Sequence, residues 1–286
     1  METPGATWPA GDTPAAAEIV PSEPQFLPSE PEFLPSEPGF LPAEMVFGGT
    51  PAVAGWHVRV VDETGSTNTD LMAAAAAGAA DRSVLVARHQ TAGRGRLDRK
   101  WEAPPGANLL VSLLFRDPPA HAHELIQRVA LAAVGAARTV ADVDAQLKWP
   151  NDVLVGDAKL AGVLAQAGTS VGTGPSRLDH LVVGIGVNVQ WSPEGGARLG
   201  QDIDPLAVLA AMLVAYDRLP ADVHPLYRAG LGTLGRQVRV ELPNGTALLG
   251  RAIDVGRDGR LAVLDDCAIT HHFDTGDVVH VRTGEK

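Results

Sequence analysis

The sequence predicts an α+β domain with a mixed sheet and flanking helices, followed by a small all-β barrel and preceded by an extended tail. Three observations indicate this order. Strand-like and helix-like segments intermingle in the middle of the 286-residue chain. The end of the chain holds short strand-like segments between tight-turn residues, and its beginning repeats a proline-rich heptapeptide. We expect a tail over 1–54, a catalytic α/β domain over 55–232 and a barrel over 233–286.

The tail is predicted to be disordered. Its repeats are Pro21–Leu27, Pro28–Leu34 and Pro35–Leu41, each with two prolines, which forbid a continuous helix. Residues 1–50 carry eight acidic side chains and no Lys or Arg, so most of the net charge of −11 belongs to the tail. The composition favours a solvated leader over a segment whose Phe-Leu pairs dock on a partner.

The middle of the chain supplies the elements of the α/β domain. Thr67–Asp70 resembles a capping box that opens an alanine-rich helix over Leu71–Ala77. Further helices are expected over His123–Val140, Asp204–Leu219 and Leu226–Leu231. The strand-like segments are His57–Val61, Ser83–Arg88, Asn108–Phe115, Gln146–Trp149, Asp152–Val155, Lys159–Gln166 and Leu181–Val189.

The barrel is indicated by five short segments with turn residues between them. They are Gln237–Leu242, Ala247–Val255, Leu261–Leu264, Ala268–Phe273 and Val278–Arg282.

Composition excludes several functional classes. No apolar run approaches the roughly 18–20 residues that a membrane span needs, and no secretory signal opens the chain. The single cysteine, Cys267, argues for a reducing cytoplasmic location, and we expect it to be a small buried side chain. The net negative charge argues against general nucleic-acid binding. We therefore expect neither a membrane nor a nucleic acid as a partner.

The first candidate functional segment is the loop Gln90–Trp101, which holds three arginines, a lysine and two glycines. Glycines let backbone amides approach an anion, and guanidinium groups add bidentate phosphate contacts. From these residues alone, a phosphate-binding loop and a solvated basic loop are equally supported.

Two more segments carry candidate chemistry. Lys148 and Lys159 flank a predicted turn at Pro150–Asp152, and both lie beside apolar residues, where a lysine usually needs an anionic partner. Gly184 and Gly186 interrupt a strand, which marks close approach either of a ligand or of another element.

These motifs, in this order, resemble those of biotin–protein ligases over about Val60–Val189. The motifs are Ser66–Asn68, Gly93–Arg96, Arg99–Trp101, Lys148–Asp152, Lys159–Gly162 and Gly184–Asn188. The chain departs from the family in the basic loop, where Leu97-Asp98 replaces the Arg-Gly of some members. It also shows the proline-rich tail where repressor-type members carry a DNA-binding domain, so we expect a monofunctional ligase without that domain.

The resemblance implies a biotin/lipoate ligase-like catalytic domain with an SH3-like C-terminal domain, and an enzyme of the biotin–[biotin carboxyl-carrier protein] ligase class. Such an enzyme forms biotinyl-5′-AMP from biotin and ATP, with Mg²⁺ carried by ATP and no protein-bound metal. It then passes biotin to a lysine of the biotin carboxyl carrier domain of an acetyl-CoA or acyl-CoA carboxylase.

The resemblance also implies roles for individual residues. The predicted catalytic residues are Lys159, Arg94, Asp152 and Lys148. The predicted biotin-binding residues are Ser66, Thr67, Asn68, Gln90, Gly93, Arg94, Gly95, Arg96, Lys159, Gly162 and Gly184. The predicted ATP- or adenylate-binding residues are Arg94, Arg96, Trp101, Lys159 and Asn188.

Two alternatives to this function stay open. A lipoate–protein ligase shares the fold and the chemistry. A biotin-responsive repressor would need a helix-turn-helix and a basic face, and residues 1–55 offer neither.

Overall fold

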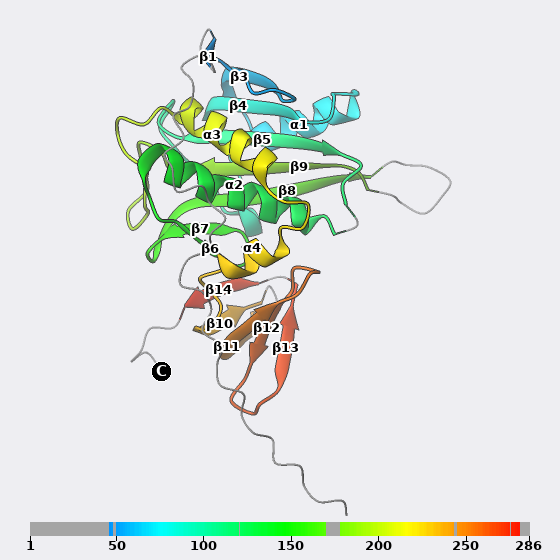
Figure 1. Ribbon diagram of the computed structural model, residues 1–286, viewed down its shortest axis with the longest axis vertical. Helices are drawn as coiled ribbons and strands as arrows, with labels where there is room; N and C mark the ends of the chain where they lie inside the picture. Colours follow the sequence, from blue (N-terminus) through cyan, green and yellow to red (C-terminus); the bar gives the residue numbers. More distant parts are fainter. Residues whose placement is uncertain are drawn as a thin grey trace, which may run out of the picture. The chain divides into compact units, whose positions relative to one another are not determined.

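The computed structural model describes residues 46–47, 50–119, 121–169, 178–242, 245–274 and 276–280. The heptapeptide repeats of the tail lie outside these residues, and all of the described residues belong to one compact unit. Figure 1 shows the elements in sequence colours.

A seven-stranded sheet organises the first part of the fold, in the order β3-β4-β5-β9-β8-β7-β6. Only β3 and β4 run parallel, and every other pair of neighbours is antiparallel, which confirms the predicted mixed sheet. The strands are β3 (His57–Thr64), β4 (Ser83–Gln90), β5 (Leu109–Arg116), β6 (Gln146–Lys148), β7 (Asp152–Val155), β8 (Ala158–Thr169) and β9 (Leu178–Val187).

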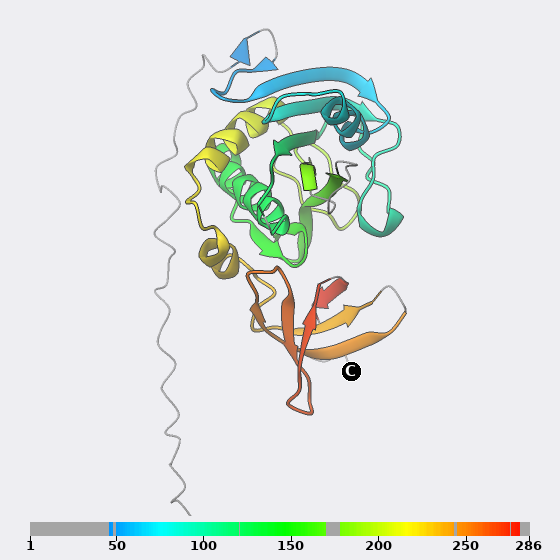
Figure 2. The ribbon, with the colours of Figure 1, turned by 90° about the vertical axis from the view of Figure 1, so that its right-hand side faces the viewer.

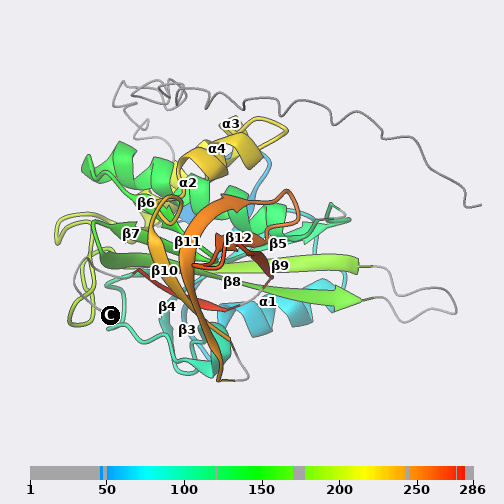
Figure 3. The same ribbon diagram turned by 90° about the horizontal axis from the view of Figure 1, so that it is seen from below.

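Helices cover both faces of this sheet (Figure 3). They are α1 (Thr67–Ala76), α2 (His123–Ala141), α3 (Pro205–Arg218) and α4 (His224–Ala229). Alternating side chains of one strand serve different layers: Leu113 packs in the large core with α2 and α3, whereas Leu114 packs beneath α1 with Leu71. None of the described helices is long and apolar enough to cross a membrane.

The start of α1 differs from the sequence-based expectation. Ser66 occupies the N-cap position, but its side chain makes no capping hydrogen bond. Thr67 lies inside the helix, and Asp70 accepts a hydrogen bond from Thr64 instead of closing a capping box. The predicted capping box is wrong because these polar side chains bond to other partners.

A five-stranded antiparallel sheet forms the C-terminal part, in the order β13-β12-β11-β10-β14, and confirms the predicted all-β domain. Its strands are β10 (Gln237–Glu241), β11 (Ala247–Val255), β12 (Leu261–Leu264), β13 (Thr270–Phe273) and β14 (Asp277–His280). Cys267 lies exposed in the turn between β12 and β13, so the expectation that it is buried is wrong. Its backbone N–H donates to the Asp265 carboxylate, which ties it into a surface turn.

Two short strands lie within the range predicted as the tail, β1 (Val46–Phe47) and β2 (Thr50–Pro51). They pair with each other, and Val53, which follows them, is buried in the large core. Trp56, also buried, donates through its indole N–H to Asp217 on α3 and anchors the start of β3.

Figure 2 shows the C-terminal sheet, in orange and red, below the seven-stranded sheet. Trp149 joins the two sheets. Its indole N–H donates to the carbonyl of Gly259 (2.9 Å), and its backbone N–H donates to the hydroxyl of Thr233 (3.1 Å). The ring of Trp149 is buried, and three residues further along the chain is Asp152 of the candidate site. The C-terminal sheet is therefore attached directly beside a candidate catalytic residue.

Candidate active site

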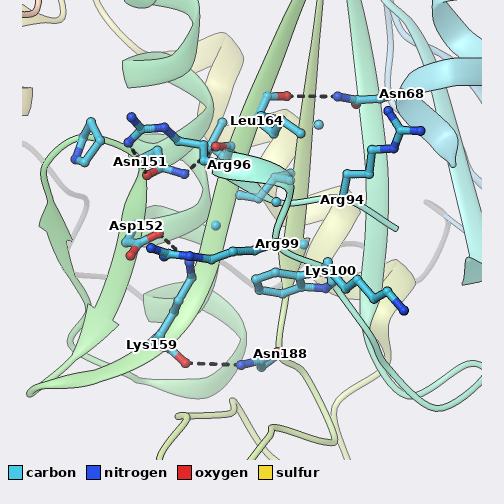
Figure 4. A pocket seen from close by; sticks show the side chains of 18 of the residues that line it. Asn68, Arg94, Arg96, Arg99, Lys100, Asn151, Asp152, Lys159, Leu164 and Asn188 are labelled. Atoms are coloured by element: carbon cyan, nitrogen blue, oxygen red, sulfur yellow. Dashed lines mark hydrogen bonds and ion pairs between the residues drawn. The ribbon is translucent and has the colours of Figure 1, made fainter. Parts of the chain in front are cut away.

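A pocket of about 660 Å³ lies between the α1 side of the large sheet, the loop Gly93–Trp101 and strand β14 (Figure 4). Its lining is polar at the start of α1 and strongly cationic beside the loop. Six cationic side chains and four carboxylates line it.

The polar end is a chain of hydrogen-bonding groups around α1. The Thr67 hydroxyl lies 3.0 Å from Gln90 Oε1 and 2.7 Å from the Ser112 hydroxyl. Ser112 also lies 2.6 Å from Asn68 Oδ1. Backbone partners fix both amides: the Thr67 N–H donates to Gln90 Oε1, and Asn68 Nδ2 donates to the Leu164 carbonyl.

This group of hydrogen-bonding side chains has fewer donor protons than oxygen–oxygen contacts. It ends in two carbonyl oxygens, which only accept, and its two hydroxyls supply one proton each for three oxygen–oxygen contacts. The nearby Ser66 hydroxyl, which does not cap α1, also faces the pocket. The polar end therefore favours a ligand group that brings N–H donors.

Glycines of β8 and β9 form the floor. A Cβ at Gly184 would overlap the Asn68 amide, and a Cβ at Gly186 would overlap the Trp101 indole. A Cβ at Gly162 would lie 3.2 Å from the same indole. Asn68 and Trp101 therefore lie against bare backbone, so the close approach expected at Gly184 and Gly186 is made here by other elements of the chain.

Lys159 lies at the cationic end, in an ion pair with Asp152 (2.6 Å) and 5.6 Å from the centre of the Trp101 ring. Lys148 faces Asp152 across the β6–β7 pair. Burial lowers the pKa of the Lys148 ammonium, and Asp152 partly offsets that lowering. Cations that lack full compensation favour an anionic ligand.

The basic loop folds on itself as a narrow hairpin. The backbones of Arg94 and Lys100 form an antiparallel β-bridge. The Gly95 N–H donates to the Arg99 carbonyl (2.6 Å), and the Trp101 N–H donates to the Gly93 carbonyl (3.0 Å). Arg96 turns inward, where its Nη1 donates to Asn151 Oδ1 (3.3 Å). Burial is the main cause that lowers the pKa of Arg96, and Asp152 opposes it.

Asn188 is buried beneath Lys159. Its Nδ2 donates to the carbonyls of Lys159 (3.2 Å) and Ala197 (3.0 Å), and its Oδ1 accepts from Asn108 (3.3 Å). Because these bonds use both N–H groups of the amide, we expect Asn188 chiefly to hold the backbone of Lys159, which leaves only its Oδ1 able to accept a bond from a ligand.

The structure brings nearly all of the predicted site residues to one pocket. The lining includes Ser66, Thr67, Asn68, Gln90, Arg94, Gly95, Arg96, Trp101, Lys148, Asp152, Lys159, Gly162, Gly184 and Asn188. Gly93 does not line it: a Cβ there would overlap the Trp101 carbonyl, so this glycine lets the two arms of the loop pass closely.

Sequence reasoning missed several residues of the site. Ser112 had a signal, since it is a lone hydroxyl within an apolar strand, and such a buried group needs partners. Trp191, which lines the pocket after β9, had none. Nor did the C-terminal sheet residues that complete the wall, because long-range packing brings them there. They are Glu241, Asp277, Val278 and Val279.

Comparison with known proteins agrees with this geometry. Residues 60–188 match the biotin/lipoate A/B protein ligase family, and residues 233–281 match the biotin protein ligase C-terminal domain. The biotin–[acetyl-CoA-carboxylase] ligase of Mycobacterium tuberculosis is 36% identical over 261 residues, which cover 81% of this chain and 92% of that protein. The bifunctional ligase/repressor BirA of Bacillus subtilis is 28% identical over 240 residues, covering 75% and 71%.

Solved structures share the fold. The biotin protein ligase of Aquifex aeolicus in complex with biotin and ATP gives a TM-score of 0.62 at 24% identity, over 79% of this chain and 99% of that one. The Leishmania major enzyme in complex with biotinyl-5-AMP gives 0.53 at 20% identity, over 77% and 99%.

The fold and site thus define an enzyme of the ligase class with a biotin ligase-like catalytic domain and an SH3-like C-terminal domain. The chain belongs to the biotin protein ligase family.

Proposed function

We propose that this enzyme joins biotin to ATP as biotinyl-5′-AMP and then transfers biotin to one lysine of a biotin carboxyl carrier domain. The observation that carries the proposal is a single pocket with a donor-seeking polar end and a cationic end around Lys159. A relative is named for acetyl-CoA carboxylase, and solved structures of the same fold hold biotin with ATP or biotinyl-5-AMP.

Biotin would enter with its ureido ring at the polar end. The ring offers two N–H groups to acceptors such as Gln90 Oε1 and the hydroxyls of Ser66 and Thr67. The bare backbone at Gly162 and Gly184 leaves room for the ring and the acyl chain above the sheet.

In the first step a carboxylate oxygen of biotin attacks the α-phosphorus of ATP, and the bond to pyrophosphate breaks. Two anions must meet, so a cation between them lowers the barrier. Lys159, which lines the pocket, would take this role, while Arg94 and Arg96 would bind the phosphate and keep water from the mixed anhydride. Trp101 would lie toward the adenine side.

Magnesium would enter bound to the ATP phosphates, as this ion generally prefers. Two carboxylates of the pocket are already in ion pairs, Asp152 with Lys159 and Asp277 with Arg99. This pairing fits an ion that is held by the ATP phosphates and not by protein carboxylates.

In the second step the acceptor lysine attacks the acyl carbon, an amide bond forms and AMP leaves. The amine must first lose a proton. One oxygen of Asp152 is paired with Lys159, and the other would orient the amine and receive or relay its proton. Lys148 would hold the turn and add positive potential.

The acceptor would be the carrier domain of an acetyl-CoA or acyl-CoA carboxylase, in the cytoplasm. Neither nucleic acid nor a membrane takes part in the proposed reaction.

A direct test supplies purified carrier domain, ATP and either radiolabelled biotin or radiolabelled lipoate. We expect biotin to be incorporated and lipoate to be rejected, because the dithiolane ring of lipoate brings no N–H donor to the acceptor-rich end. Incorporation of lipoate in preference to biotin would instead identify a lipoate–protein ligase.

A further inference from the structure

The tip of the basic loop contacts the C-terminal sheet. Arg99 forms an ion pair with Asp277, the first residue of β14, and Arg96 Nη1 lies 3.4 Å from the Gly276 carbonyl, to which it donates. The Asp277 side chain is 22% exposed, whereas that of Arg99 is 64% exposed, so the carboxylate is the fixed partner and the arginine the movable one.

Contacts within the loop do not by themselves fix its tip over the pocket. Its two arms pair through their own backbones, as at Arg94 and Lys100, and this pairing does not orient the hairpin toward the pocket. Leu97 has a left-handed backbone (φ 54°) and is 52% exposed, so it provides no apolar anchor. The position of the tip over the pocket therefore depends on polar contacts with Asn151 and with the start of β14.

The charges beside the tip would otherwise push it away. Arg99 lies close enough to Arg96 and Lys148 that its charge helps to lower the pKa of both. Such repulsion moves an exposed arginine outward unless an anion balances it. Asp277 supplies that anion from a strand that also lines the pocket.

We propose that Asp277 is a positioning residue that holds Arg99, and with it the basic loop, over the pocket before any phosphate arrives. The C-terminal sheet then controls how long the activated intermediate stays bound. This last consequence rests on the proposed adenylation, whereas the holding of the loop does not.

Trypsin can test the holding without any substrate, because Arg94, Arg96, Arg99 and Lys100 are potential cleavage sites. We expect Asp277→Asn to speed cleavage in the loop several-fold at unchanged melting temperature, since the loop opens more often. The matched control is Asp274→Asn, an exposed carboxylate before β14 with no ion pair to another described residue; it should be cleaved at the wild-type rate. Equal cleavage of both variants would overturn the proposal.

A second variant guards against a folding defect in the first. Arg99→Gln breaks the same pair from the loop side, so cleavage after Arg94 and Arg96 should accelerate to the same extent. The double variant Arg99→Gln/Asp277→Asn should add nothing further. Additive acceleration would show that the two side chains act independently and would contradict the proposal.

The consequence for the intermediate is measured with biotin, ATP and serum albumin in place of the carrier domain. Asp277→Asn should raise albumin labelling several-fold over wild type and over Asp274→Asn, as released adenylate acylates bystander lysines. Labelling at the wild-type level, with pyrophosphate still released, would refute control of the intermediate. If the wild-type enzyme releases no pyrophosphate at all, adenylation itself is refuted, and the trypsin comparison still decides the holding.

Discussion

Three neighbours fix the position of the Lys159 ammonium. Asp152 pairs with it at 2.6 Å, the Trp101 ring lies beneath it, and Asn188 holds its backbone carbonyl. The Lys159 side chain is held in place but is still 40% exposed, so it can contact an incoming phosphate. This arrangement suits a group that must stabilise charge as it develops on phosphorus.

Lys159→Ala should therefore reduce pyrophosphate release from biotin and ATP by at least about 100-fold, the effect of losing one electrostatic stabiliser of a transition state. The melting temperature should change little, because the side chain is 40% exposed. The measurement is a pyrophosphate assay beside a thermal melt. Unchanged pyrophosphate release would remove Lys159 from the mechanism.

Gly186→Ala tests the floor of the pocket. The new Cβ would overlap the Trp101 indole, and such overpacking costs about 1–3 kcal/mol. We expect the Michaelis constant for ATP to rise about tenfold or more, since 1.4 kcal/mol corresponds to a factor of ten.

Gly65→Ala is the matched control for this variant, because a Cβ at Gly65, next to Ser66, meets nothing within 4 Å. If both alanine variants bind ATP equally well, the indole is not held against Gly186 in solution.

Strand β14 ends at His280, close to Lys148 and Arg236, with Asp157 as the opposing charge. Burial and these cations lower the pKa of His280 from 6.5 to about 4. Between these two values the unfolded chain binds more protons than the folded one, so stability falls as the pH falls. The contribution of His280 is complete above about pH 6.5 and is lost progressively toward pH 4.

Urea unfolding at pH 7 and pH 5 checks this prediction. We expect the midpoint of the wild-type protein to drop on acidification and that of His280→Gln to drop less. An equal drop in both proteins would show that His280 does not titrate as proposed.

The sequence allowed most of the strands and helices to be predicted because alternation and helical spacing are local signals, as in Asp204–Leu219 against the observed α3. The sequence motifs also identified most of the residues that line the pocket. Thr67 and Asp70 misled the prediction of the α1 start, because Thr67 bonds to Gln90 and Asp70 to Thr64 instead of capping the helix. Asp277 could not be predicted, since its place in the pocket depends on packing between two sheets.

At the scale of the whole molecule, the tail and the rest of the chain differ in charge, because residues 1–50 hold eight acidic side chains and no Lys or Arg. Deleting residues 1–45, which keeps β1 and β2, should leave biotin transfer and the melting temperature unchanged. The deleted segment holds no basic residue for phosphate binding, and its repeats carry two prolines each.

The assay compares full-length and truncated enzyme on purified carrier domain, with a thermal melt of each. A several-fold rise in the Michaelis constant for carrier, at an unchanged value for biotin, would show that the Phe-Leu pairs recruit the acceptor. A lower melting temperature would show instead that the tail packs on the enzyme.

The bonds of Trp149 to Gly259 and Thr233 limit how freely this chain can exchange parts with its relatives. Consider a chimaera whose last 54 residues, after the predicted boundary at Gly232, come from another ligase. Its Trp149 would meet different partners in place of Thr233 and Gly259, and different residues would line the pocket in place of Asp277 and Val279. Such a graft therefore changes the lining of the candidate active site. We therefore expect a chimaera at this junction to stay active only when the donor supplies both the Trp149 contacts and the β14 side of the pocket.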